Sequence, residues 1–279
     1  SPVRGRLIRL GALADAILSR HDLPDAVLTM GGQALALVAG MASALKFKGS
    51  FSLQIKGDGP VSMLLADATD TGDLRFTARL AEDADPAALP TSPKELLGNG
   101  YLAFTIDQGA DMDRHQGIVE LTGETLSEMA VHYFQTSEQH DCWIRLFCLK
   151  TVDGWSASAL VLERIADEGG IENDAQAEDA WETACTFAET LRDQEIVDET
   201  LESVVLIHRL FGTLDVQIAT PRALAYGCRC SRARLASVLE RFGEDDRDHM
   251  VKNGAVTMNG EFCNVGFRFT RDELGEKPA

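Results

Sequence analysis

The chain lacks the sequence motifs of the common enzyme classes. It contains no G-x-x-x-x-G-K-[ST] phosphate loop, no H-E-x-x-H helix and no Ser, His and Asp in the order of a hydrolase triad. It also has no C-x-x-C pair, the arrangement that thiol oxidoreductases favour. Two glycine pairs, at 57–59 and 98–100, are explained more simply as hairpin turns than as phosphate-binding loops. The sequence therefore predicts a protein that is not an enzyme.

Positive charge is scarce in this chain. Its 279 residues include 26 Lys and Arg against 44 Asp and Glu, a formal net charge of −18. Such an excess of negative charge repels phosphate groups, so we expect neither nucleic acid nor a membrane as a partner. The same charge favours solubility, which suits a protein that must stay dispersed while it holds partly unfolded partners.

A secretory leader and long apolar runs are also missing from the sequence. We find no charged-then-apolar leader and no apolar run of ~18 or more residues, which predicts a soluble, cytoplasmic protein. The first residue is Ser1 rather than Met, which leaves open that native sequence precedes the strand-like or helical run at 3–10. Disulfides are rare in the cytoplasm, so the scattered Cys142, Cys148 and Cys185 are expected to be small buried apolar residues.

The remaining pattern predicts an α+β fold whose N-terminal α/β core, residues 1–165, has antiparallel sheets packed against helices. A helix at 30–45 is rich in small residues, which permits close packing against a sheet. Thr125 and Glu128 form a capping box at the start of another helix. An antiparallel meander is the expected arrangement of the strands. Strand-like runs lie at 51–56, 61–66, 74–80, 101–106, 144–150 and 156–165, and a further short helix is expected at 12–19.

An acidic helical linker is predicted at 166–221. Between 165 and 191 there is no Lys or Arg, and like charges at helical spacing repel, so a helix around Trp181 and Cys185 must depend on tertiary contacts. Such a helix is either a candidate for conditional unfolding or an ordinary solvated helix with one buried stripe. A second helix is expected at 198–210, with His208 packed in the core. The acidic residues of the first segment are Asp167, Glu168, Glu172, Asp174, Glu178, Asp179, Glu182 and Glu189.

Three of the six cysteines lie close to the C-terminus, in the region 222–279 that we interpret as a cysteine domain. Cys228 and Cys230 form a C-x-C pair, which can place two thiolates on one metal ion, and Cys263 follows downstream. Thiolates bind zinc and are also the form that oxidants attack. These three residues are therefore the candidate metal ligands and the candidate redox sensors.

The neighbours of the C-x-C pair favour the thiolate form. A helix predicted at 231–242 would place Cys228 and Cys230 near its N-terminus, where the helix dipole stabilises negative charge. Three arginines in this region are also expected to stabilise the thiolates by their positive charge, namely Arg229, Arg232 and Arg234.

Taken together, these segments closely resemble the redox-regulated 33-kilodalton heat-shock chaperone family, a group of bacterial holdases. The resemblance runs nearly from end to end, and the order and approximate spacing of the segments also match. The matching segments are VRGRLIRLG (3–11), LKFKGSFSLQIKGDGP (45–60), LLGNGYLAFTI (96–106), HQGIVELTGETLSEMAVHYFQTSEQ (115–139), RLFC (145–148), CRCSRARL (228–235) and MNGEFCN (258–264).

The resemblance implies a substrate-binding core that tends to dimerise, a metastable helical linker and a zinc domain whose four cysteines hold the metal when reduced. It also implies a chaperone that acts without ATP. Oxidation of the thiolates releases the zinc, the domain and the linker unfold, and the exposed apolar surface binds unfolding client proteins. A homodimer is the expected active form.

One position departs from the family pattern. Gly260 stands where the fourth cysteine belongs, and it has no side chain to offer as a ligand. Three outcomes remain open: zinc bound by three sulfurs with His249, Asp248 or water as the fourth ligand, a weak or vacant site, or a decayed or engineered module. The plainer interpretation of His249 is a solvated loop residue. Oxidation leaves a bridge between Cys228 and Cys230 possible, although the short loop is strained and easily reduced.

Two hypotheses of function follow from this sequence. The first is a redox-switched holdase, with Cys228, Cys230 and Cys263 as sensors and zinc ligands. The second is a constitutive client-binding protein whose oxidation switch is impaired because Gly260 replaces a cysteine.

Overall fold

The computed structural model describes residues 3–44, 48–109, 114–165, 174–228, 230–270 and 273, and it divides into two units, Ser1–Tyr226 and Gly227–Ala279. Arg229 and three acidic residues of the predicted linker, Asp167, Glu168 and Glu172, lie outside the described residues. Within the described residues the fold is α+β, as predicted.

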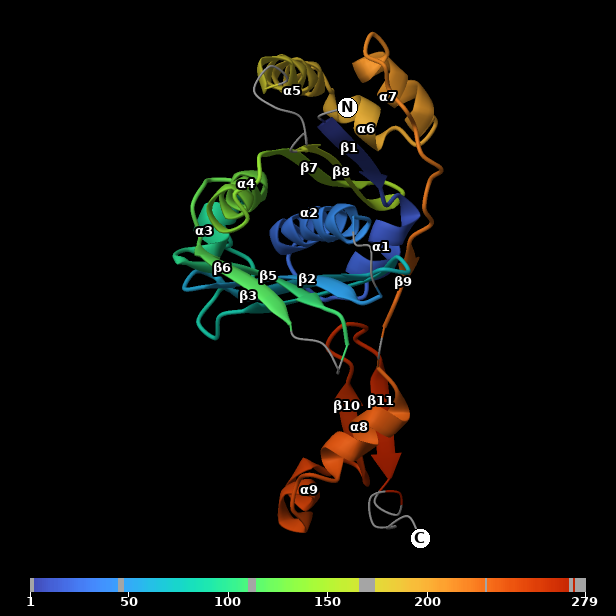
Figure 1. Ribbon diagram of the computed structural model, residues 1–279. Coiled ribbons are helices and arrows are strands. Elements are labelled where there is room, and N and C mark those ends of the chain that lie inside the picture. Colours follow the sequence, from blue (N-terminus) through green and yellow to red (C-terminus); the bar gives the residue numbers. More distant parts are fainter. Residues whose placement is uncertain are drawn as a thin grey trace. The chain divides into compact units, whose positions relative to one another are not determined.

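The larger sheet of the first unit has six strands in the order β6-β5-β2-β3-β4-β9 (Figure 1). All neighbours pair antiparallel except β9, which runs parallel to β4. The predicted meander is right for β2, β3 and β4 but wrong for β5, which pairs with the other side of β2. The connection after β4, which contains α3 (Pro93–Leu97), carries the chain back across the sheet. The strands are β2 (Ser50–Gly57), β3 (Val61–Thr69), β4 (Asp73–Leu80), β5 (Gly100–Asp107), β6 (His115–Glu120) and β9 (Ala225–Tyr226).

A second, three-stranded antiparallel sheet has the order β1-β8-β7. It consists of β1 (Val3–Arg9), β7 (Cys142–Thr151) and β8 (Gly154–Arg164), the last two joined by a tight turn. The run at 3–10, which the sequence left open between strand and helix, is a strand paired with β8. Two further helices complete this part of the core, α1 (Ala12–Leu18) and α4 (Leu126–Ser137), and the predicted capping box of Thr125 and Glu128 is present in α4.

Helix α2 (Asp25–Ala42) lies between the two sheets (Figure 1). It contacts β3, β4 and β2 on one side and β8, β7 and β1 on the other. A Cβ atom on Gly31 would come within 2.4 Å of the Phe76 ring on β4, and one on Gly32 within 2.3 Å of the Cys148 Sγ on β7. The small residues of α2 therefore permit close packing against both sheets. The helix begins at Asp25, earlier than predicted, and its first turn adds the buried side chains of Val27 and Leu28.

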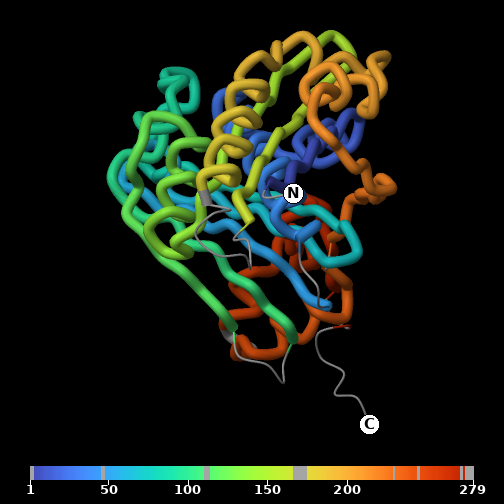
Figure 2. The backbone as a smooth tube through the Cα atoms, turned by 45° about the horizontal axis from the view of Figure 1, so that its top comes forward, coloured from blue at the N-terminus to red at the C-terminus, as the bar shows by residue number. Residues whose placement is uncertain are grey.

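Three linker helices cover the other face of the three-stranded sheet, as Figures 1 and 2 show: α5 (Asp174–Glu189), α6 (Asp193–Val197) and α7 (Ser203–Phe211). Phe147, Leu160 and Leu162 of the sheet are buried against them. The helices contribute the buried residues Ala184, Ala188, Ile196, Leu206, Leu210 and Phe211, and the segment between α5 and α6 contributes Leu191. The acidic helix thus makes tertiary contacts along its described residues, and its dependence on them stays a prediction.

Two details of the predicted linker were wrong. The helix expected at 198–210 begins at Ser203, and the short α6 before it was not predicted. His208 is exposed rather than packed in the core, because Leu206 and Leu210 provide the buried side of α7. Short helices of this kind are set by the surface on which they pack, which local sequence does not reveal.

The C-terminal unit contains two helices, α8 (Arg232–Leu239) and α9 (Glu244–Met250), and the hairpin β10 (Ala255–Asn259) with β11 (Gly266–Thr270). Only α8 was predicted. Among the described residues, its apolar cluster has three buried members, Leu239, Val256 and Phe269. A unit with so small a core gains little stability from apolar burial alone.

Among the described residues, α2 is the one helix long and apolar enough to cross a membrane by length and composition. Since 78% of it is buried inside the first unit, it passes this test as a core helix.

Candidate metal centre

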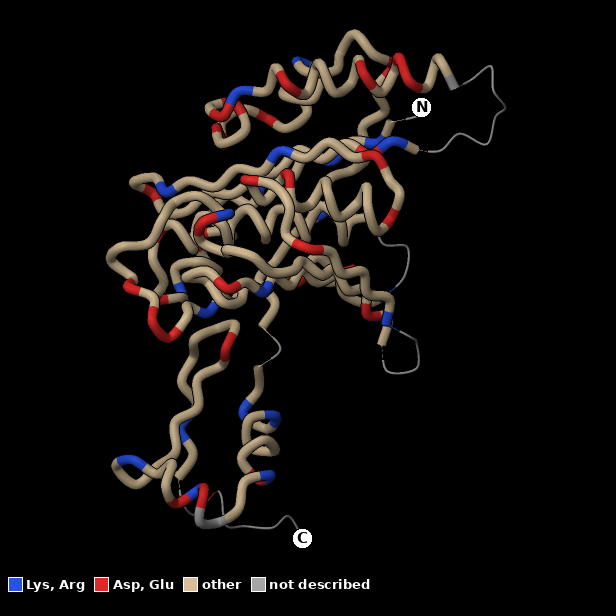
Figure 3. Tube along the Cα trace, turned by 90° about the vertical axis from the view of Figure 1, so that its left-hand side faces the viewer, with Lys and Arg blue, Asp and Glu red and all other residues tan. Residues whose placement is uncertain are grey.

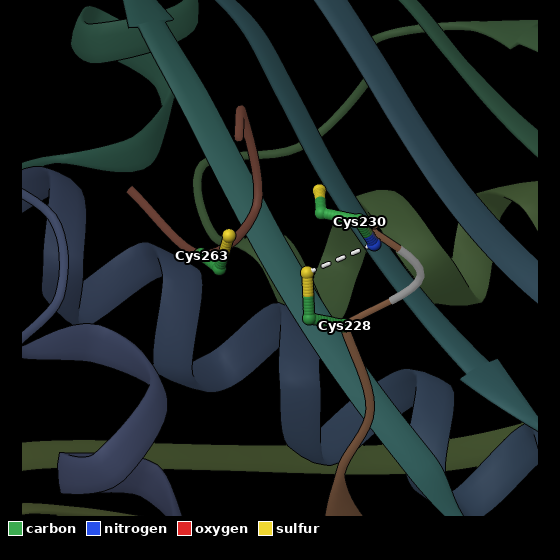
Figure 4. Close-up of side chains that lie close together, drawn as sticks. All are labelled: Cys228, Cys230 and Cys263. Carbon is green, nitrogen blue, oxygen red and sulfur yellow. Dashed lines mark hydrogen bonds between the residues drawn. The ribbon is translucent and has the colours of Figure 1, made fainter. Parts of the chain in front are cut away.

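Cys228 and Cys230 lie in the segment between β9 and α8. The side chain of Ser231 caps α8 by accepting a hydrogen bond from the Arg234 backbone N–H at 3.2 Å, so the helix begins directly after the cysteine pair. The backbone N–H of Cys230 donates to the Sγ of Cys228 at 3.2 Å (Figure 4). This hydrogen bond turns the two sulfurs of the C-x-C pair toward a common point.

Cys263 lies in the turn that joins β10 to β11. The carbonyl oxygen of Gly260 accepts hydrogen bonds from the backbone N–H groups of Cys263, at 3.2 Å, and of Asn264, at 2.7 Å. The Gly260 N–H in turn donates to the Val265 carbonyl at 3.0 Å. The backbone at both ends of the Gly260–Cys263 turn is therefore fixed, and so is the direction in which each side chain leaves it.

The three predicted site cysteines come together in the structure. Their Sγ atoms all lie within 4.8 Å of one another (Figure 4), with Cys263 buried and the other two partly buried. Sulfurs that share a tetrahedral zinc ion are about 3.8 Å apart, given zinc–sulfur bonds of about 2.3 Å. Three thiol groups at this spacing fit a thiophilic metal ion, so Cys228, Cys230 and Cys263 could hold one.

The Cys230 thiol resists ionisation while no cation is present. Burial, followed by the neighbouring sulfurs of Cys228 and Cys263, raises the pKa of Cys230 from 9.0 to about 12. The expectation that the helix N-terminus and the arginines favour the thiolate is therefore wrong for Cys230. Arg232 instead pairs with Glu273 at 2.6 Å and lies over the Phe269 ring. A bound metal cation would reverse this preference for the neutral thiol, because a metal ion deprotonates the thiols that coordinate it.

Gly260 faces the cluster. A Cβ atom built on it would lie 2.5 Å from the Cys263 Sγ and 2.9 Å from the Cys230 Sγ. The position where the family pattern has a fourth cysteine is thus directed at two of the three sulfurs, those of Cys263 and Cys230. Because glycine has no side chain, the cluster has three sulfur donors.

Neither sequence candidate for a fourth ligand joins the three cysteines in the described part of the chain. The group of potential metal ligands contains Cys228, Cys230 and Cys263, without Asp248 or His249. His249 is exposed, as expected, but it belongs to helix α9 rather than to a loop.

The three other cysteines behave as buried apolar residues. Burial raises the pKa of Cys142 and of Cys148 to about 12 and that of Cys185 to about 11. Cys142 is buried, and the other two are partly buried. A thiol that resists ionisation reacts slowly with oxidants, and these three residues do not belong to the group of potential metal ligands, where a bound cation would ionise them. They are therefore poor sensors.

Sequence reasoning missed the arginines that attach the linker to the three-stranded sheet. Arg9 of β1 donates to the backbone carbonyls of Leu201 and of Glu195, the latter at 2.6 Å. Arg145 of β7 donates to the Leu191 carbonyl at 2.7 Å. Figure 3 shows acidic positions along the linker helices and basic positions on the strands beneath them. Two ion pairs join them, Arg145 with Asp193 at 2.9 Å and Arg164 with Glu178 at 2.7 Å.

Comparison with known proteins identifies the same family as the sequence motifs, over residues 1–270. A family model described as Hsp33 protein matches residues 1–270. A 33 kDa chaperonin of Caulobacter vibrioides is 36% identical over 272 residues, covering 94% of this chain and 89% of that protein. Another, from Nitrosococcus oceani, is 34% identical over 273 residues, covering 98% of this chain and 89% of that protein.

A solved structure has the same fold. The crystal structure of a 33 kDa chaperonin, a heat shock protein 33 homologue from Thermotoga maritima, superimposes with a TM-score of 0.83. It is 22% identical and covers 98% of this chain and 92% of its own. From the family match and the curated relatives, we conclude that this chain belongs to the Hsp33 family of chaperones.

Proposed function

We propose that this chaperone is a redox-regulated holdase, which binds unfolding proteins without ATP when its thiols are oxidised. The observation that carries the proposal is the convergence of the Cys228, Cys230 and Cys263 sulfurs in a chain of this family. In the reduced state these residues hold a zinc ion as thiolates, which supplies folding free energy to the C-terminal unit. The small apolar cluster around Phe269 is the reason why that contribution matters.

Oxidation removes the metal ligands. One peroxide molecule would take two electrons from the Cys228 and Cys230 thiolates and two protons from solvent, which leaves one disulfide and two molecules of water. Cys263 alone cannot retain the ion, so the metal leaves and the C-terminal unit unfolds.

The linker carries this change to the client-binding surface. In this proposal residues 166–221 form the linker, residues 1–165 the substrate-binding core and residues 222–279 the redox domain. Helices α5, α6 and α7 cover Phe147, Leu160 and Leu162, so their release uncovers an apolar face of the three-stranded sheet. An exposed apolar face binds unfolding proteins through the hydrophobic effect.

The segment that precedes the cysteines is attached to the first unit by Arg222 and by strand β9. Arg222 donates to the backbone carbonyl of Asp70 at 2.6 Å and to that of Ser43 at 3.1 Å, and β9 adds to the larger sheet immediately before Cys228. Unfolding that begins at the cysteines therefore reaches β9 and Arg222 first, and the segment leading back to α7 next. The proposed partners are unfolded or partly folded clients, the proposed active form is a homodimer, and the proposed location is the cytoplasm.

A constitutive client-binding protein is the alternative, and Gly260 favours it. With three sulfurs the site holds its metal more weakly than four would, and Cys263 lacks an adjacent cysteine with which to pair. The reduced protein would then expose its binding surface without any oxidant.

An aggregation assay separates the two functions. A chemically denatured client such as citrate synthase is diluted into the reduced protein and into the peroxide-treated protein, and light scattering is followed. The switch predicts suppression by the oxidised form alone, with zinc release and thiol loss in parallel. Equal suppression by both forms supports the constitutive function, and suppression by neither contradicts both. The variant Cys185→Ala serves as a matched control, because its thiol lies outside the cluster.

A further inference from the structure

The missing fourth ligand leaves a specific place at the metal centre. The Cβ direction of Gly260 points between the sulfurs of Cys263 and Cys230, at 2.5 Å and 2.9 Å. A side chain at this position would have to displace these sulfurs, whose single bonds allow them to rotate. The side of the cluster that a fourth cysteine would occupy is therefore bordered by a bare backbone.

The protein backbone does not fill this place. The Gly260 carbonyl already accepts the N–H groups of Cys263 and Asn264, and its N–H is used by the Val265 carbonyl. A carbonyl oxygen with two hydrogen bonds is a poor additional ligand, and thiophilic metal ions prefer sulfur or nitrogen. Among the residues that the structure describes, no His, Asp or Glu completes the cluster.

The cluster is also open to small molecules. Cys228 and Cys230 are both only partly buried, whereas Cys263 is buried. A metal site with three protein ligands and access to solvent has an exchangeable fourth position, as zinc sites with an open position do. The three donors already present are soft sulfurs, and a borderline-soft ion in such surroundings binds a further sulfur well.

We propose that the fourth position at the Cys228, Cys230 and Cys263 site is a binding site for a low-molecular-weight thiol taken from solution, adjacent to Gly260. This inference rests on the metal-binding part of the proposed function. No redox step is involved, because the incoming thiol loses a proton to solvent, binds as a thiolate and displaces a water. Metal affinity would then depend on the concentration of reduced thiol around the protein.

The effect of thiol binding on the apparent metal affinity can be calculated. If a thiol binds only the metal-loaded site, a thiol concentration ten times its dissociation constant raises the apparent metal affinity about tenfold. An oxidant that consumes the small thiols would loosen the metal even before it reacts with Cys228 or Cys230. The site would in this way respond to the state of the surrounding thiol pool.

Cobalt(II) spectroscopy on the full-length reduced protein tests the proposal. Cobalt(II) replaces zinc in thiolate sites, and its visible bands report the ligands. We expect 2-mercaptoethanol to shift these bands saturably and to raise the apparent cobalt affinity about tenfold at a thiol concentration ten times its dissociation constant. Ethylene glycol, the oxygen analogue of the same shape, should do neither.

Two variants at one position provide the matched controls. Gly260→Cys supplies an internal fourth sulfur, so its spectrum should resemble that of the thiol-saturated wild type and ignore added thiol. Gly260→Ala adds a Cβ in the same place without a donor atom and should weaken the response to thiol at least about tenfold.

The outcomes distinguish this inference from the proposed function. Bound cobalt whose bands ignore 2-mercaptoethanol overturns the inference alone, as does a spectrum that changes in His249→Ala or Asp248→Ala. A reduced wild-type protein that binds neither cobalt nor zinc overturns both the inference and the metal-based switch. Equal thiol responses in Gly260→Ala and the wild type would place the exchangeable ligand elsewhere and also contradict the proposal.

Discussion

At the scale of single residues, the chemistry of the C-terminal unit depends on three sulfurs and one absent side chain. Cys228, Cys230 and Cys263 fit a metal ion, and Gly260 leaves its coordination incomplete. The other three thiols are held protonated by burial. Only the clustered cysteines combine spacing and access in a way that suits a redox-sensitive metal site.

Replacement of Cys263 by alanine should abolish metal binding. Two sulfurs remain in Cys263→Ala, and a site that loses a direct ligand should lose more than the 10- to 100-fold in affinity that indirect ligands contribute. Zinc per chain, measured by elemental analysis after gel filtration, checks this. The control Cys185→Ala should keep the wild-type zinc content, and retention of zinc in Cys263→Ala would contradict the assignment.

The raised pKa of Cys230 predicts that the metal-free protein loses stability at high pH. The folded state prefers the neutral thiol, so the stabilisation is complete below pH 9.0 and is lost as pH rises toward about 12. In calorimetry of the chelator-treated chain, the melting midpoint of the C-terminal unit should fall across this range. Cys230→Ser should reduce that fall, and an identical pH dependence in both proteins would contradict the prediction.

At the scale of elements, the linker helices are attached by a few buried arginine contacts in addition to their apolar side. Arg9 donates to the carbonyls of Glu195, inside α6, and of Leu201, in the segment between α6 and α7. Desolvation by burial lowers the pKa of Arg9, while Asp198 and Glu199 oppose that shift. An arginine that caps carbonyls in this way holds backbone that has no partner in a sheet or helix.

The variant Arg9→Gln should loosen α6 and α7 without unfolding the core. Loss of hydrogen bonds from a charged donor costs about 1.5 to 3 kcal/mol, which should appear as faster hydrogen exchange in 193–211. Arg4→Gln on the same strand is the control, because Arg4 is exposed. Unchanged exchange in Arg9→Gln would show that the apolar contacts alone hold the linker.

At the scale of the whole molecule, the first unit alternates two layers of helix with two layers of sheet. Helix α2 fills the space between the sheets, and the linker helices cover the outer face of the smaller sheet. The inner contacts belong to one continuous core, whereas the linker forms a separate apolar cluster. The linker can therefore leave while the inner core stays folded.

A buried charge in α5 should switch the chaperone on without oxidant. Ala184 is 4% exposed and belongs to the cluster with Phe147 and Leu160, so Ala184→Asp places a carboxylate there at a cost of about 3 kcal/mol or more. The reduced variant should bind a hydrophobic dye and suppress client aggregation. Ala175→Asp, on the exposed side of the same helix, should behave as the wild type. An undocked but inactive Ala184→Asp would place the client surface elsewhere.

Sequence reasoning succeeded where local interactions decide the structure. The alternation at 51–56, the capping box at Thr125 and the helix after Cys230 are all present, because strand periodicity and helix caps depend on neighbours along the chain. It failed for the position of β5, for the exposure of His208 and for the pKa of Cys230. These features depend on which distant surface packs against each element.

The sequence by itself determined the family, most of the strands and helices of the core, and the fact that one metal ligand of the family pattern is missing. Only the tertiary structure decided that the turn at Gly260 is directed at the sulfurs, that Arg9 is bound to linker carbonyls, and that α5 covers the smaller sheet. The reason is physical. Hydrophobic periodicity and helix caps depend on residues that are close in sequence. Contacts between distant sulfurs, carbonyls and apolar faces depend on the packing of the complete chain.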